Sequence, residues 1–218
     1  MEVISEGGLL RKDAFEALLT RLGLPLELPM PGRNVGVSAT TTRREKSFVL
    51  AVFATLDRSS SGEVDVCDLI IALSALLYTG SKSEKLAFAF DLLDENGDGR
   101  LTRRNLWRFF RCFIATILLM ACPEVSPGDF LQILADEAAA WVTSRVFSSV
   151  KDSLIDVEAA HRTTDPGSAE DEGGTDVTSV SFDEIAEWYS SEGCHTSSWI
   201  ELLNISKWVT LVHPDKEL

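Results

Sequence analysis

The chain has 218 residues, of which 45% are hydrophobic, enough for a sizeable folded core. Its formal net charge of −14 argues against nucleic acid as a partner, because phosphate binding needs a basic surface. The four cysteines form no CxxC pair, which argues against a zinc site or a disulfide framework and favours free thiols in a cytoplasmic protein.

The N-terminus carries no sign of targeting. Met1–Glu6 has neither a basic segment nor an apolar stretch, so we expect no signal peptide. Glu2 excludes the N-myristoylation signal, which needs glycine at that position. The most apolar run, Cys112–Cys122, is too short to cross a bilayer and predicts a buried helix. We therefore expect a cytoplasmic protein without a transmembrane segment.

Apolar residues at helical spacing predict helices along most of the chain. In chain order they are Leu9–Leu22, about Glu45 to Asp57, one carrying Leu69 to Leu77, one carrying Leu86 to Leu93, one carrying Leu106 to Met120, about Pro127 to Val150, Phe182–Ser190 and Ser198–Val212. The segment Gly23–Gly36 is rich in proline and glycine and cannot continue the first helix.

Residues 94–105 form the strongest motif. A twelve-residue calcium loop takes oxygen ligands from positions 1, 3, 5, 7, 9 and 12 and makes a sharp turn at a glycine in position 6. The predicted ligands are Asp94, Asn96, Asp98, the carbonyl of Arg100, Thr102 and Asn105. Asn105 replaces the bidentate glutamate of position 12, and two arginines flank it. We therefore expect a weakened Ca²⁺ site, or an empty loop that keeps the same geometry.

A second loop with the same frame lies at residues 57–68. Its predicted ligands are Asp57, Ser59, Ser61, Glu63, Asp65 and Asp68. Gly62 makes the turn, and Val64 matches Leu101 of the other loop at position 8. An aspartate at position 12 is shorter than a glutamate and tends to give one oxygen, which suits Mg²⁺. A polar turn without metal is the alternative here too.

These residues give the chain a resemblance to the EF-hand superfamily, and within it to the neuronal calcium sensor, potassium-channel-interacting and calcineurin B-like group. The resemblance covers Phe48–Leu119 and is carried by Asp68–Ser74 and Glu84–Asp94. It implies an all-α fold of paired EF-hand helix–loop–helix units with short β-bridges between their loops.

The family carries four hands, which places an N-terminal pair in residues 1–80 and a C-terminal pair in 81–218. Residues 9–45 would supply a first hand without ligands, and residues 130–190 a degenerate fourth hand. There Val180 and Glu184 match positions 8 and 12 of a loop.

Two segments of the C-terminal half stand apart from these hands. An acidic, Gly- and Ser-rich insertion is expected at about 161–178. The apolar helix 198–212 is expected to fold back onto the C-terminal hands, either as core or as a plug in their groove.

The resemblance implies a calcium-binding regulatory protein that holds an amphipathic helix of a target protein in an apolar groove. A calcium-independent EF-hand adaptor or structural subunit is the alternative. We do not expect an enzyme, since the chain shows no phosphate-binding loop and no nucleophile–base motif, and its histidines fall in predicted loops or near the end.

Several arginines lie near one face of the helix that follows the 94–105 loop. They are Arg100, Arg104, Arg108 and Arg111, with Arg103 beside them. Such a row is either a solvated face or a docking stripe for acidic side chains.

Overall fold

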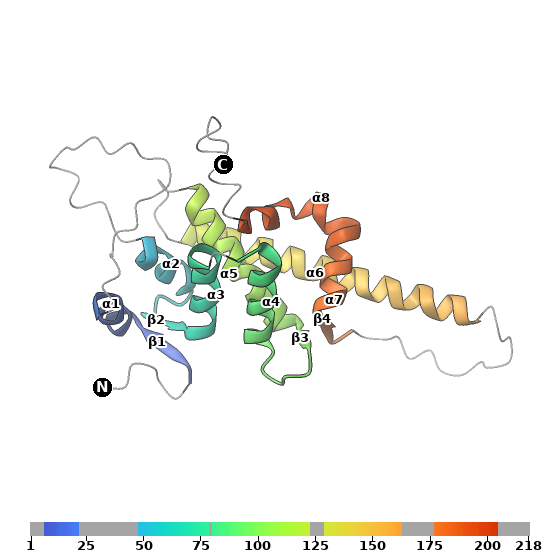
Figure 1. Cartoon of the computed structure of the whole chain (residues 1–218), viewed down its shortest axis with the longest axis horizontal. Coiled ribbons are helices and arrows are strands. Elements are labelled where there is room, and N and C mark those ends of the chain that lie inside the picture. The colour runs from blue at the N-terminus through green and yellow to red at the C-terminus, as the bar shows by residue number, and fades with distance from the viewer. Residues whose placement is uncertain (1–6, 22–47, 79, 123–128, 163–176, 205–218) are drawn as a thin grey trace.

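The computed structural model describes residues 7–21, 48–78, 80–122, 129–162 and 177–204. Its elements in chain order are β1 (Leu9–Arg11), α1 (Lys12–Arg21), α2 (Phe48–Leu56), β2 (Glu63–Asp65), α3 (Val66–Leu77), α4 (Lys82–Leu93), β3 (Arg100–Thr102), α5 (Arg103–Ala121), α6 (Asp129–Arg162), β4 (Ser179–Ser181), α7 (Phe182–Trp188), the π-helix η1 (Tyr189–Gly193), α8 (Cys194–Thr196) and the 3-10 helix η2 (Ser198–Leu203) (Figure 1). The predicted all-α fold with short β-bridges is confirmed.

The β-bridges join the loops in two pairs. β1 pairs antiparallel with β2 so that Leu10 faces Val64, and β3 pairs with β4 so that Leu101 faces Val180. All four central side chains are buried. Leu101 and Val180 therefore lie opposite one another, as residues at the same position of two paired loops are expected to lie.

We name four units of the chain hands one to four. In hand one the structure describes β1 and α1, and the other three have a helix on each side of the loop. Hand two comprises α2, loop 57–68 and α3, and hand three comprises α4, loop 94–105 and α5. Hand four comprises α6, β4 and α7. The assignment of hands one and two to residues 1–80, and of the others to 81–218, stays a prediction.

The first helix begins later than predicted. Leu9 to Arg11 form a strand, and the helix starts at Lys12. Gly8 has a φ of 71°, the left-handed conformation that glycine adopts without strain, two residues before the apolar Leu10. This is the spacing of positions 6 and 8, so α1 is the helix that leaves the loop of hand one. The segment Gly23–Gly36 lies outside the described residues.

Side chains at loop position 9 begin the helices that follow. The side-chain oxygens of Asp65, Thr102 and Ser181 accept backbone N–H groups at the start of α3, α5 and α7. Capping of this kind satisfies amide groups that a helix start leaves unpaired. The same residue therefore closes the loop and starts the helix.

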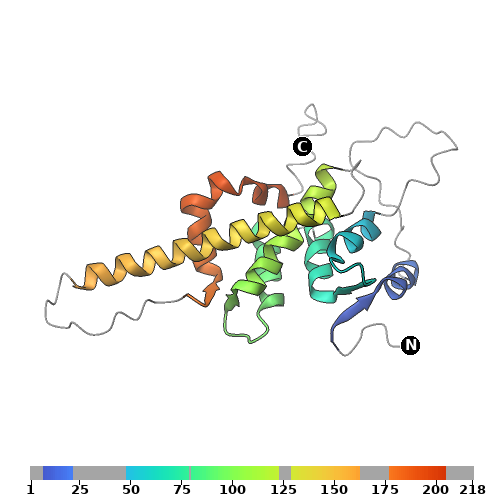
Figure 2. The ribbon, with the colours of Figure 1, turned by 180° about the vertical axis from the view of Figure 1, so that it is seen from behind.

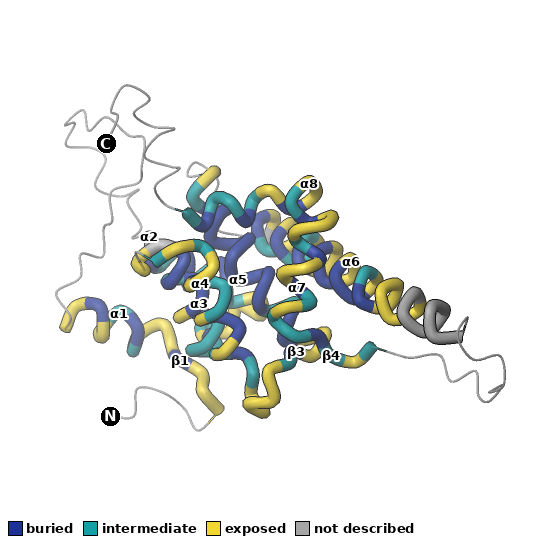
Figure 3. The backbone as a smooth tube through the Cα atoms, turned by 45° about the vertical axis from the view of Figure 1, so that its right-hand side comes forward, coloured by how far each residue is buried: buried dark blue, intermediate teal, exposed yellow. Residues whose placement is uncertain are grey.

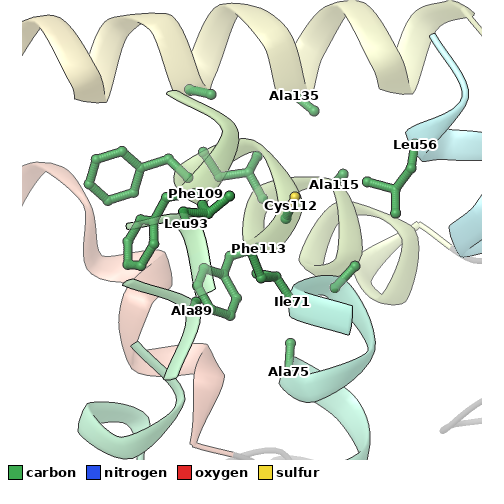
Figure 4. Close-up of a cluster of buried hydrophobic side chains, with 14 of the residues drawn as sticks. Leu56, Ile71, Ala75, Ala89, Leu93, Phe109, Cys112, Phe113, Ala115 and Ala135 are labelled. Atoms are coloured by element: carbon green, nitrogen blue, oxygen red, sulfur yellow. The ribbon is translucent and has the colours of Figure 1, made fainter. Parts of the chain in front are cut away.

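α5 lies at the centre of the core. Its aromatic residues stack edge to face, with the ring centroids of Phe109 and Phe113 5.4 Å apart. Figure 4 shows this helix between α3, α4 and α6, with Ala135 of α6 facing it. Ala135 and Ala139 are fully buried, and their small size lets α6 pack closely along α5 (Figure 2).

α6 is longer than predicted. It continues past Val150 to Arg162, and its C-terminal end projects beyond the other helices (Figures 1 and 2). Residues 151–155 are exposed, as Figure 3 shows for this end of the helix. The first residues of the expected insertion therefore belong to the helix, and 163–176 lie outside the described residues.

The tail folds back, as expected, over the residues that are described. η2 packs against α4 and α5 with Ile200 and Leu203 buried. The ring of Trp199 meets Phe110 edge to face, with centroids 6.1 Å apart. The predicted helix 198–212 is a 3-10 helix up to Leu203, and its last residues lie outside the described part.

None of the helices within the described ranges combines the length and the apolarity needed to cross a bilayer. The cytoplasmic location stays a prediction, and so does the lack of a signal in Met1–Glu6, which lies outside those ranges.

Candidate functional site

Loops 57–68 and 94–105 have the same backbone conformation. Positions 4 and 6 of each loop have positive φ: 53° at Ser60 and 76° at Gly62, and 66° at Gly97 and 72° at Gly99. Glycine reaches this region without strain, while serine enters it at a cost. Loop 94–105 therefore adopts the turn at lower cost than loop 57–68.

The position 1 carboxylates point into their loops. Asp94 accepts the N–H of Asp98 at 3.2 Å through Oδ1 and that of Gly99 at 2.7 Å through Oδ2. Asp57 accepts the corresponding N–H groups of Ser61 at 3.0 Å and Gly62 at 2.8 Å. Both loops thus orient their first predicted ligand by the same two bonds.

Of the remaining predicted ligands of loop 94–105, some side chains are exposed and one is hydrogen-bonded to the start of a helix. Asn96 and Asp98 are exposed, and Asp98 accepts the N–H of Arg100 at 3.0 Å. Thr102 is a helix cap whose hydroxyl accepts the N–H of Asn105 at 3.3 Å. The side chains at positions 1 and 5 therefore accept hydrogen bonds from within the loop, and that at position 3 is exposed, whereas the side chain at position 9 caps the following helix.

The side chain at position 12 of this loop, Asn105, makes a hydrogen bond to the backbone of the preceding helix. Asn105 is buried, and its Nδ2 donates to the carbonyl of Leu93 at 3.0 Å. This bond connects the end of α4 to the start of α5. The amide thus joins the two helices of hand three by a neutral contact.

Loop 57–68 has its exposed groups near the turn. Ser59 and Glu63 are exposed, and the Ser61 hydroxyl is shared between Asp57 Oδ1 at 3.3 Å and the carbonyl of Glu63 at 3.4 Å. Asp65 caps α3 by accepting the N–H of Cys67 at 2.8 Å. The acceptors of this loop are largely used inside it.

Arg108 of α5 reaches the C-terminal carboxylates of loop 57–68. Its Nη2 lies 2.9 Å from Oδ2 of Asp65 and 2.9 Å from Oδ1 of Asp68. Nε donates to Asp68 at 3.0 Å, and Nη1 lies 3.4 Å from Glu95. The Arg108 side chain is only 13% exposed. Burial raises the pKa of the Asp68 carboxyl, and the neighbouring guanidinium opposes that rise.

Arg100 makes a comparable contact with hand four. Its Nη2 donates to the carbonyl of Ser179 at 2.8 Å and lies 3.0 Å from Oε2 of Glu184, while Nε donates to the Ser179 hydroxyl at 3.0 Å. Glu184 also accepts the N–H of Ser181 at 2.6 Å and so caps α7. The position 12 carboxylate of hand four is therefore held by an arginine.

The arginine row is largely engaged inside the protein. Arg111 is 3% exposed and pairs with Asp136 of α6 at 2.5 Å, and the guanidinium of Arg103 lies 4.2 Å from the ring centroid of Phe147. Arg100 and Arg108 are also paired, whereas Arg104 is exposed, so a solvated face or a docking stripe stays a prediction for the exposed arginines. Spacing identified the arginines, but their partners lie far away in the sequence.

The two loops differ in how well they fit a divalent cation. Loop 94–105 offers carboxylate, amide and carbonyl oxygens, the donors that Ca²⁺ prefers, and lacks only the position 12 carboxylate. In loop 57–68, positions 9 and 12 already bind a guanidinium. Within the described ranges, no three His, Cys, Asp or Glu side chains gather closely enough to hold a metal.

Comparison with known proteins yields partial similarities. No family model matches the chain. It is 27% identical over 88 residues to a guanylyl cyclase inhibitory protein of Lithobates pipiens, covering 40% of this chain and 42% of that protein. It is 33% identical over 67 residues to the calcineurin B subunit of Schizosaccharomyces pombe, covering 31% and 38%.

The chain is similar to EF-hand proteins. It spans about two fifths of the length of the curated relatives it matches. The similarity therefore supports an EF-hand-like relationship, in agreement with the paired loops.

Proposed function

We propose that this chain is a regulatory EF-hand protein that binds Ca²⁺ in loop 94–105 and binds a helix of a partner protein. The observation that carries the proposal is the cradle at Asp94, whose two carboxylate oxygens are held by the N–H groups of Asp98 and Gly99. The names of the relatives describe an inhibitory protein and a protein subunit, which supports a regulatory role.

The chain's own residues account for the ligand set. Asp94, Asn96 and Asp98 provide side-chain oxygens, and Arg100 provides its carbonyl. A bound cation would neutralise the two carboxylates and draw these oxygens together. Because Asn105 brings no charge and is bonded to Leu93, we expect affinity at the weak end of the range for such loops.

Calorimetric titration of the metal-stripped protein with Ca²⁺ tests this assignment. Wild type should show one binding event that Asp94→Ala abolishes. Asp152→Asn, which neutralises an exposed carboxylate on α6, is the matched control and should titrate like wild type. Equal heats for wild type and Asp94→Ala, or no heat up to millimolar Ca²⁺, would reject the proposal.

Mg²⁺ at residues 57–68 stays a prediction. A cation at positions 9 and 12 of that loop would have to displace Arg108 from Asp65 and Asp68.

A calcium-independent adaptor or structural subunit is the second candidate function. It is favoured by the contacts that close the hands without a cation, namely Arg108 with Asp68, Arg100 with Glu184 and Asn105 with Leu93. The two functions differ in one observable. An adaptor binds its partner equally well in EDTA and in Ca²⁺, whereas a calcium-responsive regulator does not.

The partner helix has a candidate surface on α6, opposite the face that packs on α5. Phe130, Ile133, Leu134 and Trp141 are 67%, 60%, 41% and 48% exposed and share one face of the helix. Positions 130, 134, 137 and 141 are spaced by four, three and four residues, the spacing with which helices pack along one another. Exposed Glu137 lies within this stripe. The occupant is therefore an amphipathic partner helix with a basic residue opposite Glu137.

A synthetic amphipathic helix with one lysine in its apolar face tests this surface. Phe130→Ser and Trp141→Ser should each weaken its binding at least tenfold without changing the melting temperature. Leu77→Ser removes an exposed apolar side chain from α3 and should bind like wild type. Unchanged binding by both α6 variants would place the partner elsewhere.

A further inference from the structure

Hand two presents its last two ligand positions to a guanidinium. Asp65 and Asp68 occupy positions 9 and 12, and both lie 2.9 Å from the same Nη2 atom of Arg108. The side chains of Asp65, Asp68 and Arg108 are partly buried, with exposed fractions of 35%, 21% and 13%. A charge pair in such surroundings interacts more strongly than one in bulk water. In a metal-bound loop, the divalent cation would stand between these two positions.

Hand four repeats this arrangement with different residues. The carbonyl of Ser179 and the carboxylate of Glu184 fall at positions 7 and 12 of its loop, both of which give oxygens to a cation in a functional hand. Here both contact Nη2 of Arg100, at 2.8 Å and 3.0 Å, and the second carboxylate oxygen lies 3.4 Å away. The guanidinium of Arg100 thus donates hydrogen bonds to the same oxygens that would bind a metal ion in a functional hand.

Both arginines come from hand three. Arg100 belongs to β3 and reaches hand four across the β3–β4 bridge, while Arg108 lies in the second turn of α5 and reaches hand two. Hand three itself has no acidic side chain at position 12, and its Asn105 bonds to Leu93 instead. Each described position 12 carboxylate among these three hands is therefore paired with an arginine of hand three.

We propose that Arg108 and Arg100 take the place of the divalent cation in hands two and four, so that among hands two to four only loop 94–105 responds to Ca²⁺. The inference deepens the proposed function by naming which loop responds, and it is an alternative to the prediction that residues 57–68 hold Mg²⁺. A cation could enter hand two only by displacing a largely buried guanidinium from two carboxylates, which leaves that guanidinium with its longer contact to exposed Glu95 at 3.4 Å.

The test measures melting temperatures of full-length variants that all carry Asp94→Ala, so its outcome does not depend on Ca²⁺ binding in loop 94–105. With Arg108 intact, millimolar Ca²⁺ or Mg²⁺ should leave the melting temperature within about 1 °C of its value in EDTA. Adding Arg108→Met should lower the melting temperature in EDTA by about 5 °C, since Asp65 and Asp68 lose their partner. Either cation should then restore at least half of that loss.

Two further variants serve as a control and as a substitute in case the first variant does not fold. Arg145→Met breaks an exposed pair with Glu192, whose atoms are 3.7 Å apart, and should leave the melting temperature and its cation response unchanged. If Arg108→Met does not fold, Arg108→Lys keeps the positive charge and should remain insensitive to cation. The proposal is overturned if cation stabilises the protein that retains Arg108 or the Arg108→Lys variant, or if cation fails to restore the Arg108→Met variant.

Discussion

Asn105 donates a hydrogen bond from Nδ2 to the carbonyl of Leu93 at 3.0 Å, and both residues are buried. The bond spans the loop from the last turn of α4 to the first turn of α5. In a loop built for Ca²⁺, the residue at position 12 makes this connection through the ion. Hand three therefore holds its two helices together before any cation binds.

Asn105→Glu should convert hand three into a tighter Ca²⁺ site. The substitution restores the bidentate carboxylate of position 12, and we expect calorimetry to show at least tenfold higher Ca²⁺ affinity. The same variant should be less stable than wild type in EDTA, because it buries a carboxylate and loses the bond to Leu93. Asn105→Ala is the control, since it loses the bond without adding a ligand. Equal Ca²⁺ affinity for wild type and Asn105→Glu would show that the loop does not bind Ca²⁺ in this frame.

Asp136→Asn should destabilise the packing of α6 on α5. Arg111 is 3% exposed, and its Nε lies 2.5 Å from the carboxylate of Asp136. Removing one partner of a buried pair leaves an uncompensated charge, so we expect a loss of about 3–5 kcal/mol in urea unfolding. Glu192→Gln, in the exposed pair with Arg145, should change the free energy of unfolding by less than about 1 kcal/mol. A similarly small effect for Asp136→Asn would mean that the pair does not hold α6.

Tyr189→Phe should change how stability responds to alkaline pH. Burial, with a hydrogen bond from the hydroxyl to Glu201 at 2.8 Å, raises the pKa of Tyr189 to about 12. The ordinary value is 10.0. The folded state therefore disfavours the phenolate. The contribution of the neutral Tyr189 hydroxyl to folding stability is fully present below pH 10 and is lost as the pH rises from 10 to about 12.

Ultraviolet titration of wild type should show a tyrosine with its midpoint near 12, and this component should be missing in Tyr189→Phe. The variant should also show a smaller loss of stability over the same pH range. A wild-type titration complete by pH 11 would contradict the contact with Glu201.

Lys85→Met tests a buried cation that links the tail to the hands. Nζ of Lys85 donates to the carbonyls of Ala75 and Leu203, each at 2.9 Å, and the residue is fully buried. The variant leaves both carbonyls without this donor, so we expect a loss of about 1–3 kcal/mol at pH 7. Lys151→Met, on the exposed part of α6, should have no measurable effect.

The pH dependence of this variant has a definite sign. Burial lowers the pKa of Lys85 from its ordinary value of 10.5. The unfolded chain therefore binds the proton more strongly, and wild-type stability gains as the pH rises toward 10.5. The gap between wild type and Lys85→Met should widen over that range. A constant gap would show that folding does not lower the pKa of Lys85.

The repeating frame of the hands could be predicted from the sequence, because it depends on short spacings. Leu101 lies two positions after the turn glycine Gly99 and Val180 lies four positions before Glu184, so the sequence assigns both to loop position 8, and they pair in the structure. The same signal is present in Gly8 and Leu10, but the apolar periodicity of the following helix obscured it. Leu9 to Arg11 were therefore predicted to be helical.

The arginine contacts could not be predicted in the same way. Asp68 and Arg108 are separated by 40 residues, and only the packing of α3 on α5 brings them together. The length of α6 also escaped prediction. Residues 151–155 are exposed, so this part of the helix has no buried face that would mark it.

Equilibrium dialysis against Ca²⁺, with bound metal counted per chain, tests whether loop 94–105 binds the ion while hand two does not. We expect one bound Ca²⁺ in wild type, none in Asp94→Ala and one in Asp57→Ala. Loss of an ion in Asp57→Ala would show that hand two binds Ca²⁺ despite Arg108, and a second ion in wild type would show that another loop binds it. Either result would contradict the proposal.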